Sequence, residues 1–255
     1  MSKAINKRFF EIEKQRVELA KQGKYLKLVK MYGSKFPEIK NTNTAKFWDK
    51  KLSLLQPLSG KDGLTNARVK CAYNFLQNSA IKVLDIGAGQ GYLEELLEKR
   101  NGLKIYSNDF SKRGVELLKK RFKGVFEVMS VYNLKYPKKS FDAVFALELL
   151  EHIPPSKIFS VLRSIHGLIT KNGYFIVSVP INEHLEKMNE NPNGHLRDYK
   201  KELIIAELEL SGFMIVDFRC FSAFRMLYGF KTLLQKTILK KRWEYNDVVI
   251  KAQKV

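Results

Sequence analysis

The stretch Val83-Leu84-Asp85-Ile86-Gly87-Ala88-Gly89-Gln90-Gly91 decides the fold, because in it an apolar run passes directly into a glycine-rich turn. The apolar run predicts a buried strand, and the periodicity of Tyr92–Arg100 predicts a helix after the turn. Glycines lack a Cβ atom, so the backbone of such a turn bends sharply and can approach a ligand closely. Asp85 lies at the end of the strand, just before the turn. The stretch therefore predicts a ligand site at the carboxyl end of this strand.

Short apolar runs alternate with helical periodicity from residue 81 onward. The predicted strands are 81–86, 104–108, 125–129, 141–147, 174–179, 213–218 and 247–252. The predicted helices among them are 92–100, 112–122, 156–169 and 200–211, and those before them are 3–31, 44–56 and 64–79. Alternation of this kind is typical of an α/β fold, in which helices cover both faces of a largely parallel sheet.

The composition excludes several classes of protein. Hydrophobic residues make up 45% and charged residues 28% of the 255 residues, which suits a chain with a core and excludes global disorder. No run approaches the ~18 uncharged apolar residues of a membrane span, and the first residues lack the apolar block of a secretory signal. The two cysteines, Cys71 and Cys220, are far apart, which argues against a disulfide scaffold or a zinc site. We therefore expect a cytoplasmic protein.

The net charge of +20 is concentrated in the flanks of the chain. Lys and Arg exceed Asp and Glu by 12 in residues 1–82 and by 6 in residues 221–255, but by only 2 in residues 83–220. A basic surface attracts nucleic acid, anionic lipid or an acidic substrate. The excess of Lys over Arg fits equally well with a compositional bias that involves no polyanionic partner. Charge alone leaves both explanations open.

Polar residues also end two other predicted strands. Asp109 follows the strand at 104–108, where a carboxylate accepts hydrogen bonds from ribose hydroxyls. The cluster Glu148–His152 follows the strand at 141–147 and belongs to the same edge of a parallel sheet. A helix N-cap is the alternative role for Asp109, but Ser111 can supply that cap. These positions strengthen the ligand site indicated by the glycine-rich turn.

Together these motifs resemble the class I S-adenosylmethionine-dependent methyltransferases, in the branch of ubiquinone- and menaquinone-biosynthesis and small-molecule enzymes. The resemblance covers residues 81–220 and rests on Val83–Gly91, Asp109, Ser140-Phe141-Asp142, Glu151-His152-Ile153-Pro154 and Gly173–Pro180. It implies a Rossmann-like, seven-stranded sheet that is mostly parallel, with an antiparallel last strand and helices on both faces. It also implies that residues 1–63 form a helical, basic extension that caps the site, ahead of a methyltransferase domain at 64–255.

By this resemblance, S-adenosylmethionine lies along the glycine-rich turn. Asp85 would contact its amino end, Asp109 would hold its ribose hydroxyls, and Phe110 would pack on its adenine. Ser130 stands where the family often has an Asp near the adenine amino group, so this contact departs from the family pattern. The implied cofactor residues are Asp85, Gly87, Ala88, Gly89, Gly91, Asp109, Phe110, Ser130, Val131 and Leu147. A dehydrogenase is the alternative, but its GxGxxG pattern places the third glycine one position later.

Catalytic residues are expected near the sulfonium. Methyl transfer from a sulfonium is an in-line displacement, to which proximity and alignment contribute much of the rate. A hydroxyl acceptor must also lose its proton, which a nearby imidazole or carboxylate promotes. Glu148, His152 and His195 are the predicted catalytic residues, and Glu151 and His184 are further candidates in the same region. A loop-pinning hydrogen bond is the structural alternative for His195.

The pattern Glu148-x-x-Glu151-His152 permits a divalent metal site, because residues three and four positions apart share a helical face. Two carboxylates and an imidazole there could hold an ion that orients a pair of substrate oxygens. Some quinone-precursor and small-RNA ribose methyltransferases carry a similar motif with a metal, whereas many other methyltransferases carry Glu-His-Ile-Pro without one. The sequence leaves both alternatives open.

The predicted function is O- or C-methylation of a small molecule, lipid, quinone precursor or glycan. RNA methylation and a non-catalytic binding role are the alternatives, the former motivated by the basic flanks. Residues 221–242 carry a basic amphipathic pattern, which favours either peripheral contact with an anionic membrane or packing against the chain's own domain. Base methylation is disfavoured, because Glu148-Leu149-Leu150-Glu151 stands in place of the Asn/Asp-Pro-Pro-aromatic motif of amino-methylating nucleic-acid enzymes.

Overall fold

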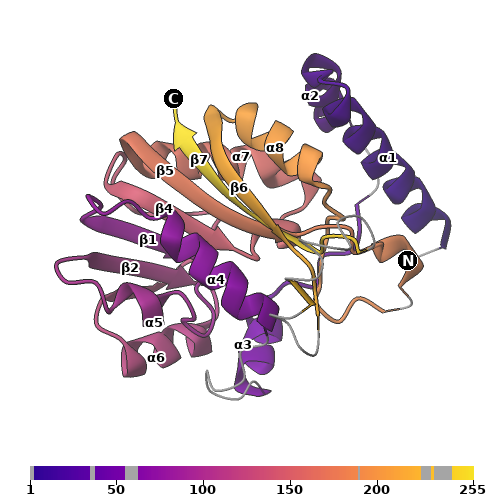
Figure 1. The fold of residues 1–255 in the computed structure, drawn as a ribbon. Coiled ribbons are helices and arrows are strands. Elements are labelled where there is room, and N and C mark those ends of the chain that lie inside the picture. Colours follow the sequence, from indigo (N-terminus) through magenta and orange to yellow (C-terminus); the bar gives the residue numbers. More distant parts are fainter. Residues whose placement is uncertain (1–2, 35–37, 55–62, 189, 225–230, 233–242) are drawn as a thin grey trace.

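A seven-stranded sheet forms the centre of the computed structural model, which describes residues 3–34, 38–54, 63–188, 190–224, 231–232 and 243–255. Its strands follow the spatial order β3-β2-β1-β4-β5-β7-β6 (Figure 1). Their bounds are β1 Lys82–Ile86, β2 Lys104–Asp109, β3 Val125–Val128, β4 Phe141–Leu147, β5 Ile169–Pro180, β6 Phe213–Phe221 and β7 Asp247–Lys254. Neighbouring strands from β3 to β5 pair in parallel, whereas β7 runs antiparallel to both β5 and β6. The predicted Rossmann-like sheet with an antiparallel last strand is confirmed.

Helices cover both faces of this sheet (Figure 1). On one face α4, α5 and α6 contribute Val69, Leu97 and Leu118 to a buried apolar cluster. On the other face α7 and α8 contribute Leu162 and Leu203 to a second cluster. The α-helices are α1 Lys3–Lys21, α2 Tyr25–Gly33, α3 Ala45–Leu54, α4 Gly63–Phe75, α5 Glu94–Leu97, α6 Lys112–Arg121, α7 Ile158–Leu168 and α8 Lys201–Glu209. The short 3₁₀ helices are η2 Leu150–His152, η3 Pro155–Lys157 and η4 Leu185–Lys187.

The strand order reverses at β1, which lies between β2 and β4. The chain adds β2 and β3 on one side of β1, and must cross to the other side to add β4 and β5. In open α/β sheets such a reversal leaves a crevice at the carboxyl ends of the strands. The glycine-rich turn after Ile86 and the polar residues after Leu147 both lie at this edge. The fold therefore brings together the motifs that the sequence singled out.

The N-terminal helical pattern forms two helices, whereas one was predicted at 3–31. α1 and α2 are separated at Gly23, whose φ of +64° is a left-handed conformation that other residues adopt only with strain. The N–H of Gly23 donates to Ala20 O (3.0 Å) and the N–H of Lys24 donates to Leu19 O (2.9 Å). This pair of hydrogen bonds closes a helix C-terminus. α1 then packs against α8, while the division of the chain at residue 63 stays a prediction.

Other bounds also differ from the prediction. The helix predicted at 92–100 is only four residues long, because turns flank α5 on both sides. β6 extends to Phe221, since it continues to pair with β7 as far as Asp247. The predicted amphipathic segment at 221–242 therefore begins inside a strand, and its residues 225–230 and 233–242 lie outside the described ones. Among the described helices, none has both the length and the apolar character needed to cross a membrane.

Candidate active site

The glycine-rich turn is pinned to the end of β2. The N–H groups of Gly87 and Ala88 both donate to the carbonyl of Asn108, at 2.8 and 3.2 Å. Gly87 and Gly89 have φ angles of +76° and +55°, which glycine adopts without steric cost. A Cβ atom on Gly89 would meet nothing nearer than 4.0 Å, so this face of the turn is open. Both glycines line two adjoining cavities, here called the first and second cavity.

Gly91 departs from its predicted role as a cofactor contact. A Cβ atom there would lie 2.5 Å from Cε2 of Phe122 and 2.8 Å from Cδ2 of Leu118. Its φ of +80° also favours glycine. Gly91 is not among the described residues that line the two cavities. The structure therefore corrects the assignment, because Gly91 serves the close packing of the turn against α6.

The carboxylate of Asp109 organises the neighbouring backbone. Its Oδ2 accepts from the N–H of Gly89 (3.0 Å) and its Oδ1 accepts from the N–H of Ser111 (2.8 Å). Ser111, rather than Asp109, caps α6, since its Oγ accepts from the N–H of Gly114 (3.0 Å). Burial raises the pKa of Asp109, although the two backbone N–H groups act in the opposite direction. Because a carboxylate has about four acceptor sites, Asp109 keeps acceptor capacity toward the first cavity, which it lines.

The first cavity lies over the ends of β1, β2 and β4. The predicted cofactor residues that line it are Gly87, Gly89, Asp109, Phe110, Ser130 and Val131. A further wall comes from the N-terminal segment, through Asn41, Asn43, Trp48 and Leu52, none of which was predicted as a site residue. The signal available for this wall was the aromatic pair Phe47-Trp48 in an otherwise polar stretch, because aromatic side chains bury large areas on binding.

Hydrogen bonds hold this wall in place at two points. Asp49 Oδ1 accepts from Ser111 Oγ (2.6 Å), which anchors α3 at the start of α6. Asn43 Nδ2 donates to the carbonyl of Gly194 (2.8 Å), and Asn43 Oδ1 accepts from Trp48 Nε1 (3.2 Å). The N-terminal segment is therefore attached both to the helix beside Asp109 and to the loop after β5.

A buried acidic pair lies behind the glycine-rich turn. The carboxyl groups of Asp85 and Glu94 interact, and Glu94 Oε1 accepts from Ser107 Oγ (2.6 Å). Burial, followed by the proximity of Glu94, raises the pKa of Asp85 well above its usual range. Asp85 Oδ1 and Glu94 Oε2 have no hydrogen-bond partner among the described residues. Asp85 lines the second cavity with Ala88 and Leu147, and its unused carboxyl oxygen fits a ligand that carries an ammonium group, whereas Glu94 is not among the described residues that line either cavity.

The second cavity contains His152 and His195, whose ring centroids lie 4.9 Å apart. The ring of Trp48 lies 4.9 Å from that of His152, and His152 Nδ1 lies 3.3 Å from the carbonyl of Gly194. Burial, followed by the proximity of His195, lowers the pKa of His152 to about 3, so this imidazole is neutral near neutral pH. His195 Nδ1 lies 2.7 Å from Oε2 of Glu183. When Nδ1–H donates to a carboxylate, Nε2 is left as the acceptor, which is the form required of a base.

Glu148 lies at the junction of the two cavities, since it lines both. Its φ of +55° is held by Ser178, whose carbonyl accepts from Glu148 N (3.1 Å) and whose Oγ donates to Glu148 Oε1 (2.8 Å). Glu148 Oε2 pairs with Arg68 (3.0 Å), which also pairs with Asp247 (2.7 Å). Both carboxyl oxygens of Glu148 are thus occupied, Oε1 by Ser178 and Oε2 by Arg68. Glu148 is therefore less suited than His195 to accept a proton.

The potential metal ligands differ from the predicted set of Glu148, Glu151 and His152. Glu151, His152 and His195 each offer a ligand atom within 4.8 Å of the others, whereas the carboxylate of Glu148 is paired with a guanidinium. Burial raises the pKa of Glu151 well above its usual range, and neither of its carboxyl oxygens has a hydrogen-bond partner among the described residues. One carboxylate and two imidazoles suit a first-row divalent metal.

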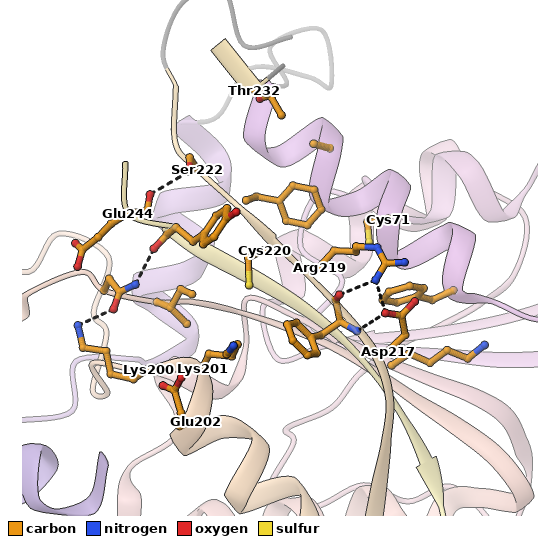
Figure 2. Close-up of a pocket in the computed structure, with 18 of the residues that line it drawn as sticks. Cys71, Lys200, Lys201, Glu202, Asp217, Arg219, Cys220, Ser222, Thr232 and Glu244 are labelled. Carbon is orange, nitrogen blue, oxygen red and sulfur yellow. Dashed lines mark hydrogen bonds and ion pairs between the residues drawn. The ribbon is translucent and has the colours of Figure 1, made fainter. Parts of the chain in front are cut away.

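A larger groove runs between α4 and the edge strand β6 (Figure 2). None of the predicted cofactor or catalytic residues is among the described residues that line it. Its Arg219 pairs with Asp217 (Figure 2). Burial raises the pKa of Cys71, which also lines the groove, to about 11, so this thiol is protonated. His184 contacts Glu244 of this groove, at 3.2 Å, and lies outside the first and second cavities. The groove therefore contributes nothing to the candidate active site.

Comparison with known proteins identifies the family. A family profile described as "Methyltransferase domain" matches residues 49–217, from α3 to β6. The chain belongs to the class I S-adenosylmethionine-dependent methyltransferases. The matched range of this methyltransferase-family chain includes the glycine-rich turn, Asp109, both histidines of the second cavity and Glu183. The resemblance found in the sequence is thereby confirmed.

Relatives of known name are distant. Ubiquinone biosynthesis O-methyltransferase of Pelagibacter ubique is 33% identical over 103 residues, which cover 38% of this chain and 41% of the relative. Carboxy-S-adenosyl-L-methionine synthase of Nautilia profundicola is 24% identical over 150 residues, which cover 57% and 64%. The structure of N-methyltransferase NodS from Bradyrhizobium japonicum, in complex with S-adenosyl-L-homocysteine, has a TM-score of 0.63 at 12% identity and covers 83% of this chain and 98% of its own. The chain thus spans 41–64% of the length of these two curated relatives, and the structural likeness shows the fold alone.

Proposed function

We propose that this chain transfers the methyl group of S-adenosylmethionine to an oxygen of a small-molecule acceptor. The observation that carries the proposal is the shared lining of the two cavities, because six residues border both: Trp48, Leu52, Gly87, Gly89, Glu148 and His152. A cofactor whose adenosine part occupied the first cavity would therefore lie next to the histidines of the second. The name of the Pelagibacter relative, an O-methyltransferase of ubiquinone biosynthesis, supports oxygen as the acceptor atom.

The residues fit S-adenosylmethionine at both of its polar ends. Asp109 offers acceptors for the ribose hydroxyls, while Asp85, which lines the second cavity, has an unused carboxyl oxygen for the amino group. The open face of Gly89 leaves room between them. When bound, the cofactor would supply a methyl group on a sulfonium, whose sulfur becomes a neutral thioether when the methyl group is transferred. The protein must then orient the acceptor and remove its proton.

His195 is the residue that we assign to proton removal. Because Glu183 accepts from Nδ1, the Nε2 atom is free to accept the proton of an acceptor hydroxyl as the new C–O bond forms. The Glu183 carboxylate then stabilises the imidazolium. His152 cannot take this role equally well, since its low pKa makes it a weak proton acceptor. It instead forms the cavity wall with Trp48.

The function is tested by a screen for S-adenosylhomocysteine formation with phenols, catechols, hydroxy acids and glycans. With the best acceptor, we expect His195→Gln to lower kcat about 100-fold, the low end of what a general base contributes. The affinity for S-adenosylhomocysteine should stay unchanged, because the proposal assigns His195 to the acceptor and not to the ribose or the amino group of the cofactor. His184→Gln is the matched control, since His184 also contacts a glutamate but lies outside both cavities. Full activity of His195→Gln, or a product methylated at carbon or nitrogen, would contradict the proposal.

A metal-assisted form of this reaction is favoured by the cluster of Glu151, His152 and His195. A divalent ion there would orient the acceptor oxygens. On protein stripped with a chelator, we expect calorimetry to detect Mn²⁺, with an affinity that falls about 10- to 100-fold in Glu151→Gln. Glu148→Gln is the comparison, because its carboxylate is already paired with Arg68. If chelation leaves methyl transfer intact and no heat of binding is seen, the metal has no part in the reaction.

A further inference from the structure

A buried cluster of ionic and phenolic groups joins the N-terminal helices to the loop at 190–199, here called the His195 loop. Its members are Glu13 and Arg16 of α1, Tyr32 of α2, Arg197 and Tyr199 of the His195 loop, and Glu207 of α8. Each of these side chains is at most 9% exposed. Two guanidinium groups face two carboxylates, and buried charges persist only when they are paired in this way. The cluster therefore fixes the relative positions of three helices and one loop.

Arg197 is the centre of this cluster. Its Nε donates to Glu13 Oε2 (3.3 Å) and its Nη2 donates to Glu207 Oε1 (2.6 Å) and to the hydroxyl of Tyr32 (3.0 Å). Its Nη1 donates to the hydroxyl of Tyr199 (3.1 Å), which in turn donates to Glu207 Oε2 (2.9 Å). One side chain of the His195 loop is thus bonded to α1, α2 and α8 at the same time.

The same loop forms one side of the second cavity. The N–H of Leu196 donates to the carbonyl of Glu151 (2.7 Å), and the carbonyl of Gly194 contacts His152 Nδ1. His195 lies between these two backbone contacts and two residues before Arg197. A movement of the loop would therefore change the geometry of His195 and would also unpair a fully buried guanidinium.

We propose that Arg197 and Tyr32 are positioning residues, through which α1 and α2 hold His195 and its loop against the second cavity. The inference rests on the proposed role of His195, whether that residue removes a proton or binds a metal. None of the described side chains of α1 or α2 lines the first or second cavity. The described part of the N-terminal extension thus has two roles. Residues 41–52 line the cavities, whereas α1 and α2 support the His195 loop from the side away from them.

The competing explanation is that the cluster only docks α2 on α8. A second contact between these helices separates the two explanations: Tyr25 of α2 donates to Glu209 Oε2 of α8, at 2.6 Å. It joins the same residue types and the same two helices as Tyr32 and Glu207, but within the described part of the chain no hydrogen bond connects it to the His195 loop. Tyr25→Phe is therefore the matched control for Tyr32→Phe.

Hydrogen–deuterium exchange on the full chain provides the test. In Tyr32→Phe we expect the amides of the His195 loop, Leu196 above all, to exchange about tenfold faster, which corresponds to about 1.4 kcal/mol of local opening. In Tyr25→Phe the loop should exchange as in the wild type. In a Trp243→Phe background, which leaves Trp48 as the only tryptophan of the chain, fluorescence should change with Tyr32→Phe alone. The affinity for S-adenosylhomocysteine should be the same in all variants.

Equal exchange of the loop in the two variants, or faster exchange throughout the sheet, overturns the proposal in favour of simple docking. If Tyr32→Phe does not fold, Glu13→Gln replaces it, with the exposed Glu11→Gln on the same helix as its control. Absence of S-adenosylhomocysteine binding by the wild type would instead overturn the proposed function. The exchange experiment would still decide whether the helices position the loop.

Discussion

Asp109→Ala is expected to weaken the binding of S-adenosylhomocysteine about 1000-fold, or about 4 kcal/mol, because two charge-assisted hydrogen bonds of about 1.5–3 kcal/mol each are lost. The carboxylate would accept from the ribose hydroxyls on its cavity side. On its other side it accepts from the N–H groups of Gly89 and Ser111, which the alanine leaves without a partner. The variant therefore loses both a ligand contact and the shape of the turn. Titration calorimetry at a temperature at which the variant is folded measures the change.

Asp142→Ala is the matched control for this experiment. Asp142 Oδ2 also accepts from two backbone N–H groups, those of Ile81 and Lys82, at 2.9 Å each. It lies at the start of β4, so it organises the opposite edge of the sheet. Asp142→Ala should lower stability and leave the affinity for S-adenosylhomocysteine within about twofold. If Asp109→Ala behaves in the same way, the proposed cofactor site is wrong.

Gly91→Ala should destabilise the fold by about 3 kcal/mol, the sum of about 1–2 kcal/mol for a left-handed alanine and about 1–3 kcal/mol for overpacking. The overpacking arises because the new methyl group would lie 2.5 Å from the ring of Phe122. For a chain of this size the loss corresponds to a fall in Tm of about 6–12 °C. Calorimetric or fluorescence melting measures it.

Gly102→Ala separates the two contributions. Gly102 has a φ of +79°, nearly that of Gly91, but nothing lies within 4 Å of the position of its Cβ atom. It should therefore show the backbone strain alone, about 1–2 kcal/mol. The opposite result for Gly91→Ala, an unchanged Tm with a large loss of S-adenosylhomocysteine affinity, would return Gly91 to the cofactor site.

The sequence predicted which residues lie together at the centre of the candidate site, because there the relevant residues are close in sequence; their roles stay predictions. A buried run that ends in Asp85 and a glycine-rich turn has a strong local pattern, and Asp109 and His152 follow their strands directly. Parallel strands then bring these ends to one edge of the sheet, as the strand order shows. The position of these residues at one edge of the sheet could therefore be predicted without knowledge of the tertiary packing.

The rest of the site depends on contacts between distant segments. Arg68 pairs with Glu148, and Glu183 contacts His195, only in the folded chain. No sequence pattern identifies Arg68 or Glu183 as a site residue. Trp48 belongs to the segment that was predicted to cap the site, but the sequence did not indicate which of its residues line the cavity. Gly91 was misassigned for the opposite reason. Its motif is local, but the need for glycine there comes from packing against Phe122, which follows α6.

The carbonyl of Gly194 receives both Asn43 Nδ2 and His152 Nδ1, so a single backbone oxygen joins the covering segment to the imidazole. A movement of residues 41–52 away from the first cavity would therefore also release the imidazole of His152 at the second. We expect access to one cavity to be coupled in this way to the geometry of the other.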